Sequence, residues 1–401
     1  MKRKMWGNTP YFHGQWLKIG LFVLFFMTAC AGLSGCAGNP EVKQISDNGN
    51  LLFYNGPVYV KNRQGQYVAY LDRTGGTWLH ELESDRKVLV HNYDEMTRPS
   101  NGLADDHAAP AIIAMDEDDI LFATAYHGSD LHLYRIRDMK VVESKTLKGS
   151  YTYPMFFKHK DVVFLFVRDY SGEKNGGDFV VFRSSDNFSK NTVVIPSKNS
   201  EVIYAAVPFI DDDGILIGYA IHRYADNSMR DFHVASFGFD FQEKWACNLT
   251  HLVEGAFYNR PTAIAKKDSK ILLGTSYFDE ASFLMAEKMV FSQKNRVLIV
   301  EWKTGNCESF HEVYEKEVEA PYYNTDVHIN ESLDFIFFGE SDYFSNLNLD
   351  GCFLGVRNIY PRFVLRGFLV FARMNGDFYN IRSFDNSLYR CKSVGDGFYS
   401  R

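Results

Sequence analysis

The chain has 401 residues, of which 46% are hydrophobic and 16% aromatic, and it carries 50 acidic against 43 basic residues. A formal net charge of −7 without a Lys/Arg-rich run argues against a nucleic-acid partner. It leaves an acidic glycan open, because a local pocket of Arg and His side chains can bind an anion on an acidic protein.

Residues 1–35 have the features of a secretory leader. A basic region that contains Lys2, Arg3, Lys4 and Lys18 leads into an apolar stretch, Ile19–Leu33. That stretch is too short to span a bilayer comfortably, which favours a cleaved signal peptide over an uncleaved membrane anchor. Losing four basic residues lowers the net charge of the mature chain to about −11.

The leader ends in Leu33-Ser34-Gly35-Cys36, which resembles a bacterial lipobox. The resemblance implies that Cys36 is the first mature residue and carries lipid, and a poorer alternative site ends at Cys30. Ala37 follows the cysteine in place of Asp, which implies sorting to the outer membrane. We therefore expect a protein held on the bacterial outer membrane by lipid on Cys36, facing the periplasm or the cell exterior.

After a tether over residues 36–47, residues 48–401 are predicted to be all-β. Short runs rich in Val, Ile, Phe and Tyr alternate with Asp, Asn, Gly and Ser, and long amphipathic helical segments are absent. First strands are predicted to open at Pro57, Pro110, Pro154, Pro208 and Pro261. Second strands are predicted at Tyr67–Leu71, Ile120–Tyr126, Val162–Val167, Ile215–Ile221 and Ile271–Tyr277.

Two further copies of this unit are predicted, one with strands near Val327 and over Phe335–Gly339, and one formed by Phe363–Arg373 and Phe378–Ile381 with Leu51–Tyr54. Repeats of roughly 40–60 residues with four short strands each are typical of a β-propeller. We therefore predict a single, seven-bladed β-propeller, with a β-sandwich or two stacked barrels as the alternatives.

In each predicted hairpin the start of the first strand and the end of the second meet at one edge. His, Arg and Tyr dominate the residues at these positions. His107 in Asp105-Asp106-His107 and His127 in Tyr126-His127-Gly128 bracket one hairpin and are predicted to lie side by side. Part of the Tyr enrichment has a structural explanation, since tyrosine suits an exposed rim.

Such a set suits β-elimination from a uronate sugar, which needs a group that neutralises the carboxylate, a base and an acid. Hydrolysis would instead need two facing carboxylates, and Asp72, Asp106 and Asp342 lie in scattered blades. The best sialidase-type Asp-box candidate, Ser184–Asn191, lacks its Gly and Trp.

The segments Asp105–Pro110, Tyr126–Asp130 and Tyr151–Pro154 resemble the BNR-repeat propeller family that includes ulvan-type polysaccharide lyases. The likeness runs from about residue 48 to 240. It implies catalytic roles for a set of five residues: His107, His127, Tyr170, Arg183 and Tyr224. Residues predicted to contact substrate beside them are Tyr153, Arg168, His222 and Arg223.

His107 is expected to act as base or proton relay, and Tyr170 as base or acid. His127 and Arg183 are expected to hold the carboxylate, with Arg168 competing for Arg183's role, and Tyr224 to contact sugar. The expected activity is that of a monomeric, membrane-anchored lyase acting on an acidic polysaccharide. The alternative is a non-catalytic propeller lipoprotein that binds glycan or an envelope protein.

Four cysteines follow Cys36: Cys247, Cys307, Cys352 and Cys391. In an exported protein they can form up to two disulfides, with three possible pairings. Cys247 with His251 is a weak zinc signal. We expect no metal and no cofactor.

Overall fold

The computed structural model describes residues 42–338 and the strands at 369–374, 377–384 and 387–392. The described range omits 47–48, 51–57, 73, 94–107, 109, 116–117, 127, 171–176, 199–200, 224, 227, 282–293, 304–305, 320–325, 330–332 and 334. The chain divides into two compact units, Met1–Pro40 and Glu41–Arg401, and every described residue belongs to the second. Among these residues, no helix is both long and apolar enough to cross a membrane.

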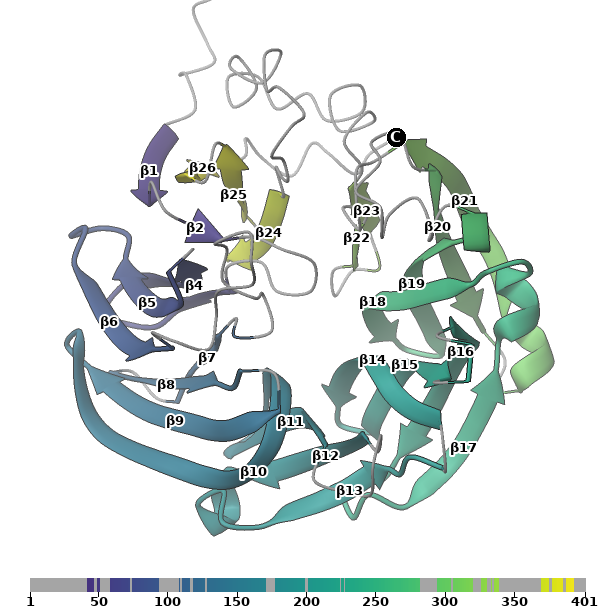
Figure 1. Cartoon of the computed structure of the whole chain (residues 1–401), viewed down its shortest axis with the longest axis horizontal. Helices are drawn as coiled ribbons and strands as arrows, with labels where there is room; N and C mark the ends of the chain where they lie inside the picture. Colours follow the sequence, from purple (N-terminus) through teal and green to yellow (C-terminus); the bar gives the residue numbers. More distant parts are fainter. Residues whose placement is uncertain are drawn as a thin grey trace, which may run out of the picture. The chain divides into compact units, whose positions relative to one another are not determined.

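The described chain is built from four-stranded antiparallel units, which we call blades. The first contains β3 (Val58–Lys61), β4 (Gln66–Asp72), β5 (Gly76–Glu81) and β6 (Lys87–Asn92), and β2 (Gly49–Asn50) also pairs with β4. The next two form one continuous sheet of β7 (Ala111–Ala114), β8 (Asp119–Thr124), β9 (Ser129–Arg137), β10 (Lys140–His159), β11 (Val162–Asp169), β12 (Asp178–Arg183) and β13 (Asn191–Ile195). The long strand β10 closes one blade and opens the next (Figure 1).

Two further complete blades follow in the chain. One contains β14 (Glu201–Asp211), β15 (Gly214–Arg223), β16 (Ser228–Phe237) and β17 (Glu243–Asn248). The other contains β18 (Tyr258–Lys267), β19 (Lys270–Phe278), β20 (Lys294–Trp302) and β21 (His311–Glu319). Three short 3-10 helices lie between strands: η2 (Ser184–Asp186), η3 (Thr250–Val253) and η4 (Cys307–Ser309).

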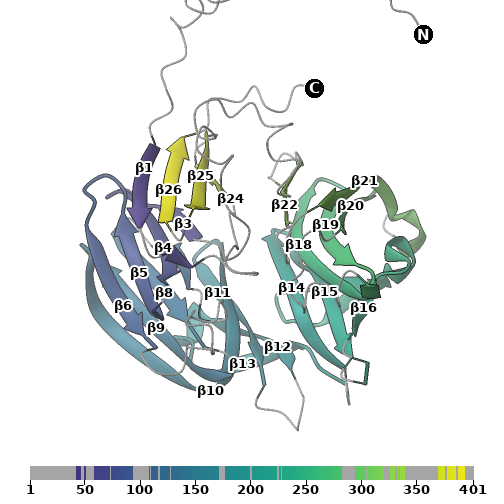
Figure 2. The ribbon, with the colours of Figure 1, turned by 45° about the horizontal axis from the view of Figure 1, so that its top comes forward.

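The remaining strands form an antiparallel pair and an antiparallel sheet that contains strands from both ends of the chain. β22 (Asp326–Ile329) pairs with β23 (Phe335–Phe338). β24 (Leu369–Met374), β25 (Asp377–Phe384) and β26 (Ser387–Lys392) form a sheet that the N-terminal β1 (Val42–Ser46) completes, beside β26 in both views (Figures 1 and 2). The N-terminal strand that completes the C-terminal sheet is therefore Val42–Ser46, which lies within the predicted tether. The predicted segment Leu51–Tyr54 lies outside the described residues.

The first strands of successive blades contact one another, which is the arrangement of a β-propeller. Contacts join β3 to β7, β7 to β10, β10 to β14, β14 to β18, and β18 to β22. The hydrophobic core is divided among the seams between neighbouring blades, as where Phe122 packs with Tyr67 and Leu79. Both faces of the second strands are buried in these seams, which explains the unbroken apolar run of β11. The all-β propeller prediction is confirmed, and the number of blades stays a prediction.

The predicted second strands agree with β4, β8, β11, β15, β19 and β23 to within a few residues. Three prolines are placed differently, because Pro154, Pro208 and Pro261 lie inside β10, β14 and β18 and not at their first residues. Pro154 and Pro261 lie at a register shift, whereas Pro208 pairs in regular register with Ile217. An edge or irregular strand tolerates proline, because the missing N–H is not needed for the ladder there.

Candidate functional site

Each blade has an edge at which its first strand begins and its second strand ends, and we call this the site edge. In the β10–β13 blade Thr152 pairs with Arg168, and in the β14–β17 blade Val202 pairs with His222. Both second strands end there. Arg168 and His222, which sequence spacing places at this edge, therefore lie in neighbouring blades at corresponding ends.

Arg168 is the most unusual side chain at the site edge. It is only 3% exposed, and its guanidinium carbon lies 4.2 Å from the ring centroid of Tyr170 and 4.6 Å from that of Tyr204. Its Nε and Nη1 are buried without a hydrogen-bond partner among the described residues. Since buried polar atoms are normally bonded, these two donors indicate a place for an anionic group.

The backbone around Arg168 leaves room for the guanidinium. A Cβ at Gly177 would lie 2.8 Å from Arg168 Nε and 3.3 Å from Nη2, so a larger residue would displace the side chain. Gly177 is held in place because its carbonyl accepts a hydrogen bond from the Ile203 amide at 3.2 Å. The Tyr170 amide donates to the Ser150 carbonyl at 2.7 Å, which fixes the ring that covers Arg168.

Tyr204 connects Arg168 to the next blade. It is the extra residue of the register shift between Ile203 and Ala205, so the bulge directs it away from the regular alternation of β14. Its ring centroid lies 6.4 Å from that of Tyr153 and 5.5 Å from that of His222. We call Tyr153, Arg168, Tyr170, Tyr204 and His222 the Arg168 cluster.

Tyr153 also owes its position to a bulge. It has a φ of +55°, a left-handed backbone conformation that non-glycine residues rarely adopt, and it lies within the register shift between Thr152 and Met155. The structure thus brings four predicted residues together, with Tyr204 as an addition. Tyr204 was recognisable at the sequence level only as one of several tyrosines at this edge.

Arg183 does not join this cluster. It pairs with Phe164 near the start of β11, four residues from Arg168, which corresponds to about 13 Å along the strand. Its guanidinium carbon lies 5.4 Å from the Phe241 ring. Because β12 runs antiparallel to β11, the end of β12 lies at the blade edge opposite to the site edge.

Arg223 lies at the site edge but is already neutralised. Its Nε and Nη2 donate to Asp231 Oδ2 at 2.9 and 2.5 Å, and Glu201 lies 3.7 Å away. The guanidinium of Arg223, which was predicted to contact substrate, is therefore already paired with two carboxylates.

His107, His127, Tyr224 and Cys36 lie outside the described residues, so their roles stay predictions. The residues next to the two histidines are described. Tyr126 packs against a buried group that contains Ala108, and Thr124 Oγ1 donates to the Ala108 carbonyl at 2.9 Å. The chain immediately beside the predicted histidine pair therefore comes together at one end of the β7–β8 hairpin.

A second histidine pair, not predicted from the sequence, lies between β6 and β9. The rings of His91 and His132 stack with centroids 4.3 Å apart, and His91 Nδ1 lies 2.6 Å from the Tyr134 hydroxyl. Burial, reinforced by the charge of His132, lowers the pKa of His91 from 6.5 to about 4. Burial also lowers the pKa of His132. These histidines are neutral at physiological pH.

Of the three carboxylates considered for hydrolysis, the structure describes Asp72. Its Oδ1 accepts hydrogen bonds from Thr74 and from the Gly76 amide, and its Oδ2 accepts one from Trp78 Nε1 at 2.7 Å. Asp72 is 6% exposed and shapes the turn between β4 and β5. It is a structural carboxylate.

Cys247 and Cys307 form a disulfide, which resolves part of the cysteine prediction. The bond joins β17 to η4 and so links two neighbouring blades. It also removes the Cys247 thiol from any zinc site with His251. Within the described part of the chain, no group of three or more His, Cys, Asp or Glu side chains is arranged to hold a metal ion.

The fold and this edge define a β-propeller with an aromatic, arginine-centred cluster. Residues 65–314 match the model of the family described as BNR repeat-containing family member, and the chain belongs to that family. No curated protein matches the sequence.

Solved structures of low similarity include the α-L-arabinofuranosidase Arb93A from Fusarium graminearum in complex with an iminosugar inhibitor. It is 8% identical with a TM-score of 0.43, over 76% of this chain and 97% of that one. An α-L-arabinanase from Penicillium chrysogenum complexed with arabinobiose is 10% identical with a TM-score of 0.40, over 71% and 92%. An oligogalacturonate lyase in complex with manganese is 7% identical with a TM-score of 0.36, over 83% and 75%.

Proposed function

We propose that this protein cleaves a uronate-containing polysaccharide by β-elimination, with Arg168 holding the sugar carboxylate. The observation that carries the proposal is the buried Arg168 guanidinium, stacked between Tyr170 and Tyr204, with Nε and Nη1 unbonded among the described residues. A carboxylate matches the two nitrogens at the tip of a guanidinium, here the unbonded Nη1 together with Nη2, and such charge-assisted bonds are about twice as strong as neutral ones.

The elimination needs three groups around the bound sugar. Arg168 neutralises the carboxylate, which acidifies the proton on C5. A base removes that proton. The electron pair of the C5–H bond then forms the C4–C5 double bond, and the bond between C4 and O4 breaks. An acid then protonates O4. Tyr170 lies against Arg168 and is assigned to proton transfer with His107 as its predicted partner, and His127 is the predicted second group that holds the carboxylate.

This assignment moves the carboxylate clamp from Arg183 to Arg168. Arg183 lies at the opposite edge of its blade, whereas Arg168 is surrounded by the predicted residues Tyr153, Tyr170 and His222. Asp72 is unsuited to hydrolysis because its oxygens are committed to hydrogen bonds, and the other two carboxylates considered for it, Asp106 and Asp342, lie outside the described residues. Aromatic faces beside a buried cation also suit sugar rings, whose C–H surfaces pack on tyrosine.

Product absorbance tests the proposal directly. Incubation with polygalacturonate, alginate, hyaluronan and glucuronoxylan is expected to raise ultraviolet absorbance on one of them, because elimination creates an unsaturated uronate. Arg168→Met is expected to abolish the signal. Retention of one polymer without absorbance change would instead support the second candidate, a non-catalytic glycan-binding propeller, which the same aromatic cluster favours.

We also propose that lipid on Cys36 anchors the protein to the outer membrane. The support is the lipobox-like segment Leu33–Cys36 behind a basic and apolar leader. Wild-type protein is expected to fractionate with outer membranes and to incorporate radiolabelled palmitate, and Cys36→Ala to do neither. Equal labelling of both proteins would contradict the anchor.

A further inference from the structure

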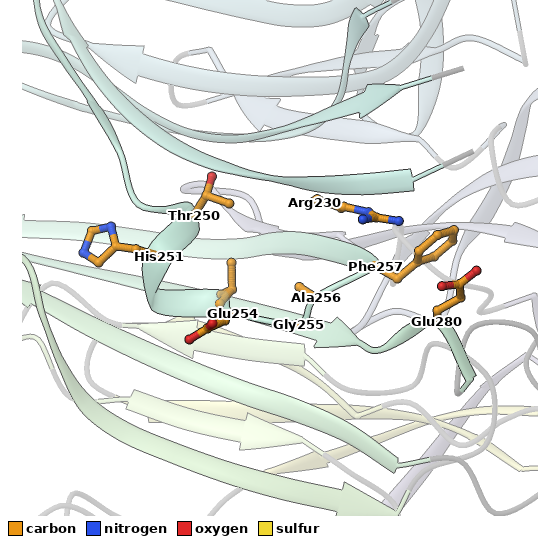
Figure 3. Close-up of a pocket in the computed structure, with 9 residues that line it drawn as sticks. Arg230, Thr250, His251, Glu254, Gly255, Ala256, Phe257 and Glu280 are labelled. Carbon is orange, nitrogen blue, oxygen red and sulfur yellow. The ribbon is translucent and has the colours of Figure 1, made fainter. Parts of the chain in front are cut away.

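A pocket of 510 Å³ lies between Arg230 of β16, the 3-10 helix η3, the segment that leads from η3 into β18, and Glu280 (Figure 3). Phe257, Val253 and Ala256 give it an apolar surface. Arg230, His251, Glu254 and Glu280 supply polar groups around it. Small-molecule sites have this size and combine an apolar lining with a few polar groups.

The pocket and the Arg168 cluster share a connecting layer of aromatic side chains. Tyr204, which covers Arg168, lies 6.3 Å from Tyr258 between ring centroids, and packs against the group formed by Met229, Phe257, Tyr258 and Phe278. The Met229 amide donates to the Phe257 carbonyl at 2.8 Å. Phe257, which lines the pocket, therefore belongs to the aromatic layer that Tyr204 joins. Arg230, which also lines the pocket, follows Met229 of that layer in β16.

The polar groups of the pocket select the class of ligand. Arg230 lies over the Phe257 ring at 5.0 Å and is 3.5 Å from Asp226, so its charge is partly balanced. Glu254 and Glu280 are two exposed carboxylates at the same pocket. These two carboxylates would repel an anionic sugar and accept hydrogen bonds from sugar hydroxyl groups. The Arg230 guanidinium can donate hydrogen bonds to the same hydroxyl groups.

We propose that this pocket is an outer subsite for an uncharged sugar of the glycan whose uronate lies at Arg168. The inference rests on the proposed function, and it adds a substrate class: chains in which acidic and neutral sugars occur together. A chain in which every unit is acidic would place a carboxylate against Glu254 and Glu280.

The test compares ligands of different length and charge pattern on the full protein, in the Tyr170→Phe background if the wild type cleaves them. The probes are disaccharides and hexasaccharides of hyaluronan, chondroitin and glucuronoxylan, with oligogalacturonate hexasaccharide as the all-acidic probe. Arg230→Ala is expected to weaken the best mixed hexasaccharide about tenfold and leave its disaccharide unchanged, as loss of one charge-assisted hydrogen bond implies. Glu254→Gln with Glu280→Gln is expected to strengthen oligogalacturonate binding.

Arg296→Ala is the matched control. Like Arg230, Arg296 lies over an aromatic ring, that of Tyr277 at 5.9 Å, and has a carboxylate nearby, Glu315 at 3.9 Å. Its side chain is 47% exposed, against 44% for Arg230. It does not line the pocket, and its substitution is expected to leave both affinities unchanged. Thermal melts confirm that each variant folds.

The outcomes separate the two proposals. If loss of Arg168 weakens binding of the mixed hexasaccharide but loss of Arg230 does not, the proposed subsite is overturned and the proposed function stands. Tighter binding of oligogalacturonate than of every mixed hexasaccharide by the wild type would also overturn it. Absence of Arg168-dependent binding of all the probes would overturn the proposed function, and the subsite with it.

Discussion

Replacing Arg168 by Met separates a ligand-binding arginine from a structural one. Methionine has a similar length and keeps an apolar contact with both tyrosine rings. It loses two cation–π contacts of about 2 kcal/mol each when desolvated and regains about 1 kcal/mol per sulfur–aromatic contact. It also removes the cost of burying Nε and Nη1 without partners, about 1–3 kcal/mol for each unmade bond.

The lost and regained ring contacts together cost about 2 kcal/mol, and removal of the two unpartnered donors returns about 2–6 kcal/mol, so the free energy of unfolding is expected to stay unchanged or to rise by up to about 4 kcal/mol. Binding of a uronate oligosaccharide is expected to weaken at least about 100-fold, since two charge-assisted hydrogen bonds together contribute about 3 kcal/mol and each 1.4 kcal/mol is tenfold. The assays are isothermal calorimetry with the oligosaccharide and urea unfolding followed by tryptophan fluorescence.

Arg86→Met is the control for this experiment. Arg86 pairs with Glu81 and Asp138 at the edge opposite to the site edge. Its loss is expected to lower stability only slightly, because exposed ion pairs are weak, and to leave affinity unchanged. A loss of several kcal/mol of stability in Arg168→Met, with affinity intact, would refute the reasoning and make Arg168 structural.

Three further predictions concern the surroundings of the site and the scaffold. Gly177→Ala is expected to weaken uronate binding about tenfold, because the new Cβ would lie 2.8 Å from Arg168 Nε; calorimetry with unchanged affinity would contradict the proposed positioning. In the folded protein His91 stays neutral down to about pH 4, whereas in the unfolded chain it takes up a proton near pH 6.5. The free energy of unfolding is therefore expected to fall by up to about 3 kcal/mol as the pH is lowered from 6.5 to about 4. Urea midpoints measured across this range should flatten in His91→Gln, and an equally steep decline in that variant would exclude His91 as the cause. Cys307→Ser is expected to cost about 4 kcal/mol, because the disulfide closes a separation of 60 residues, and a thermal melt unaffected by the substitution would contradict this.

The sequence was sufficient for the fold because the propeller is repetitive. Each second strand is buried on both faces, so its apolar run is visible without knowledge of the partner blade, as in Val162–Asp169. The prolines recur once in each of five predicted units, but the sequence does not show that Pro154 and Pro261 lie at bulges inside their strands. A bulge adds one residue to one strand, and residue alternation alone does not reveal it.

The site was predicted only in part, for reasons that particular residues illustrate. Arg168 and His222 follow from strand ends, whereas Arg183 was assigned by resemblance and lies at the other edge. Arg223 has the right register, but only the fold shows that Asp231 and Glu201 neutralise it. Tyr204 and the His91–His132 stack depend on contacts between blades, which no local pattern encodes.

The most direct test of the account is a crystal structure of the full protein, with Tyr170→Phe if the wild type cleaves the ligand, bound to a uronate-containing oligosaccharide. A sugar carboxylate is expected within hydrogen-bond distance of Arg168 Nη1 and Nη2, the two nitrogens at the tip of the guanidinium, with a sugar ring against Tyr204. A carboxylate bound at Arg183, or an oligosaccharide bound away from the site edge, would contradict it.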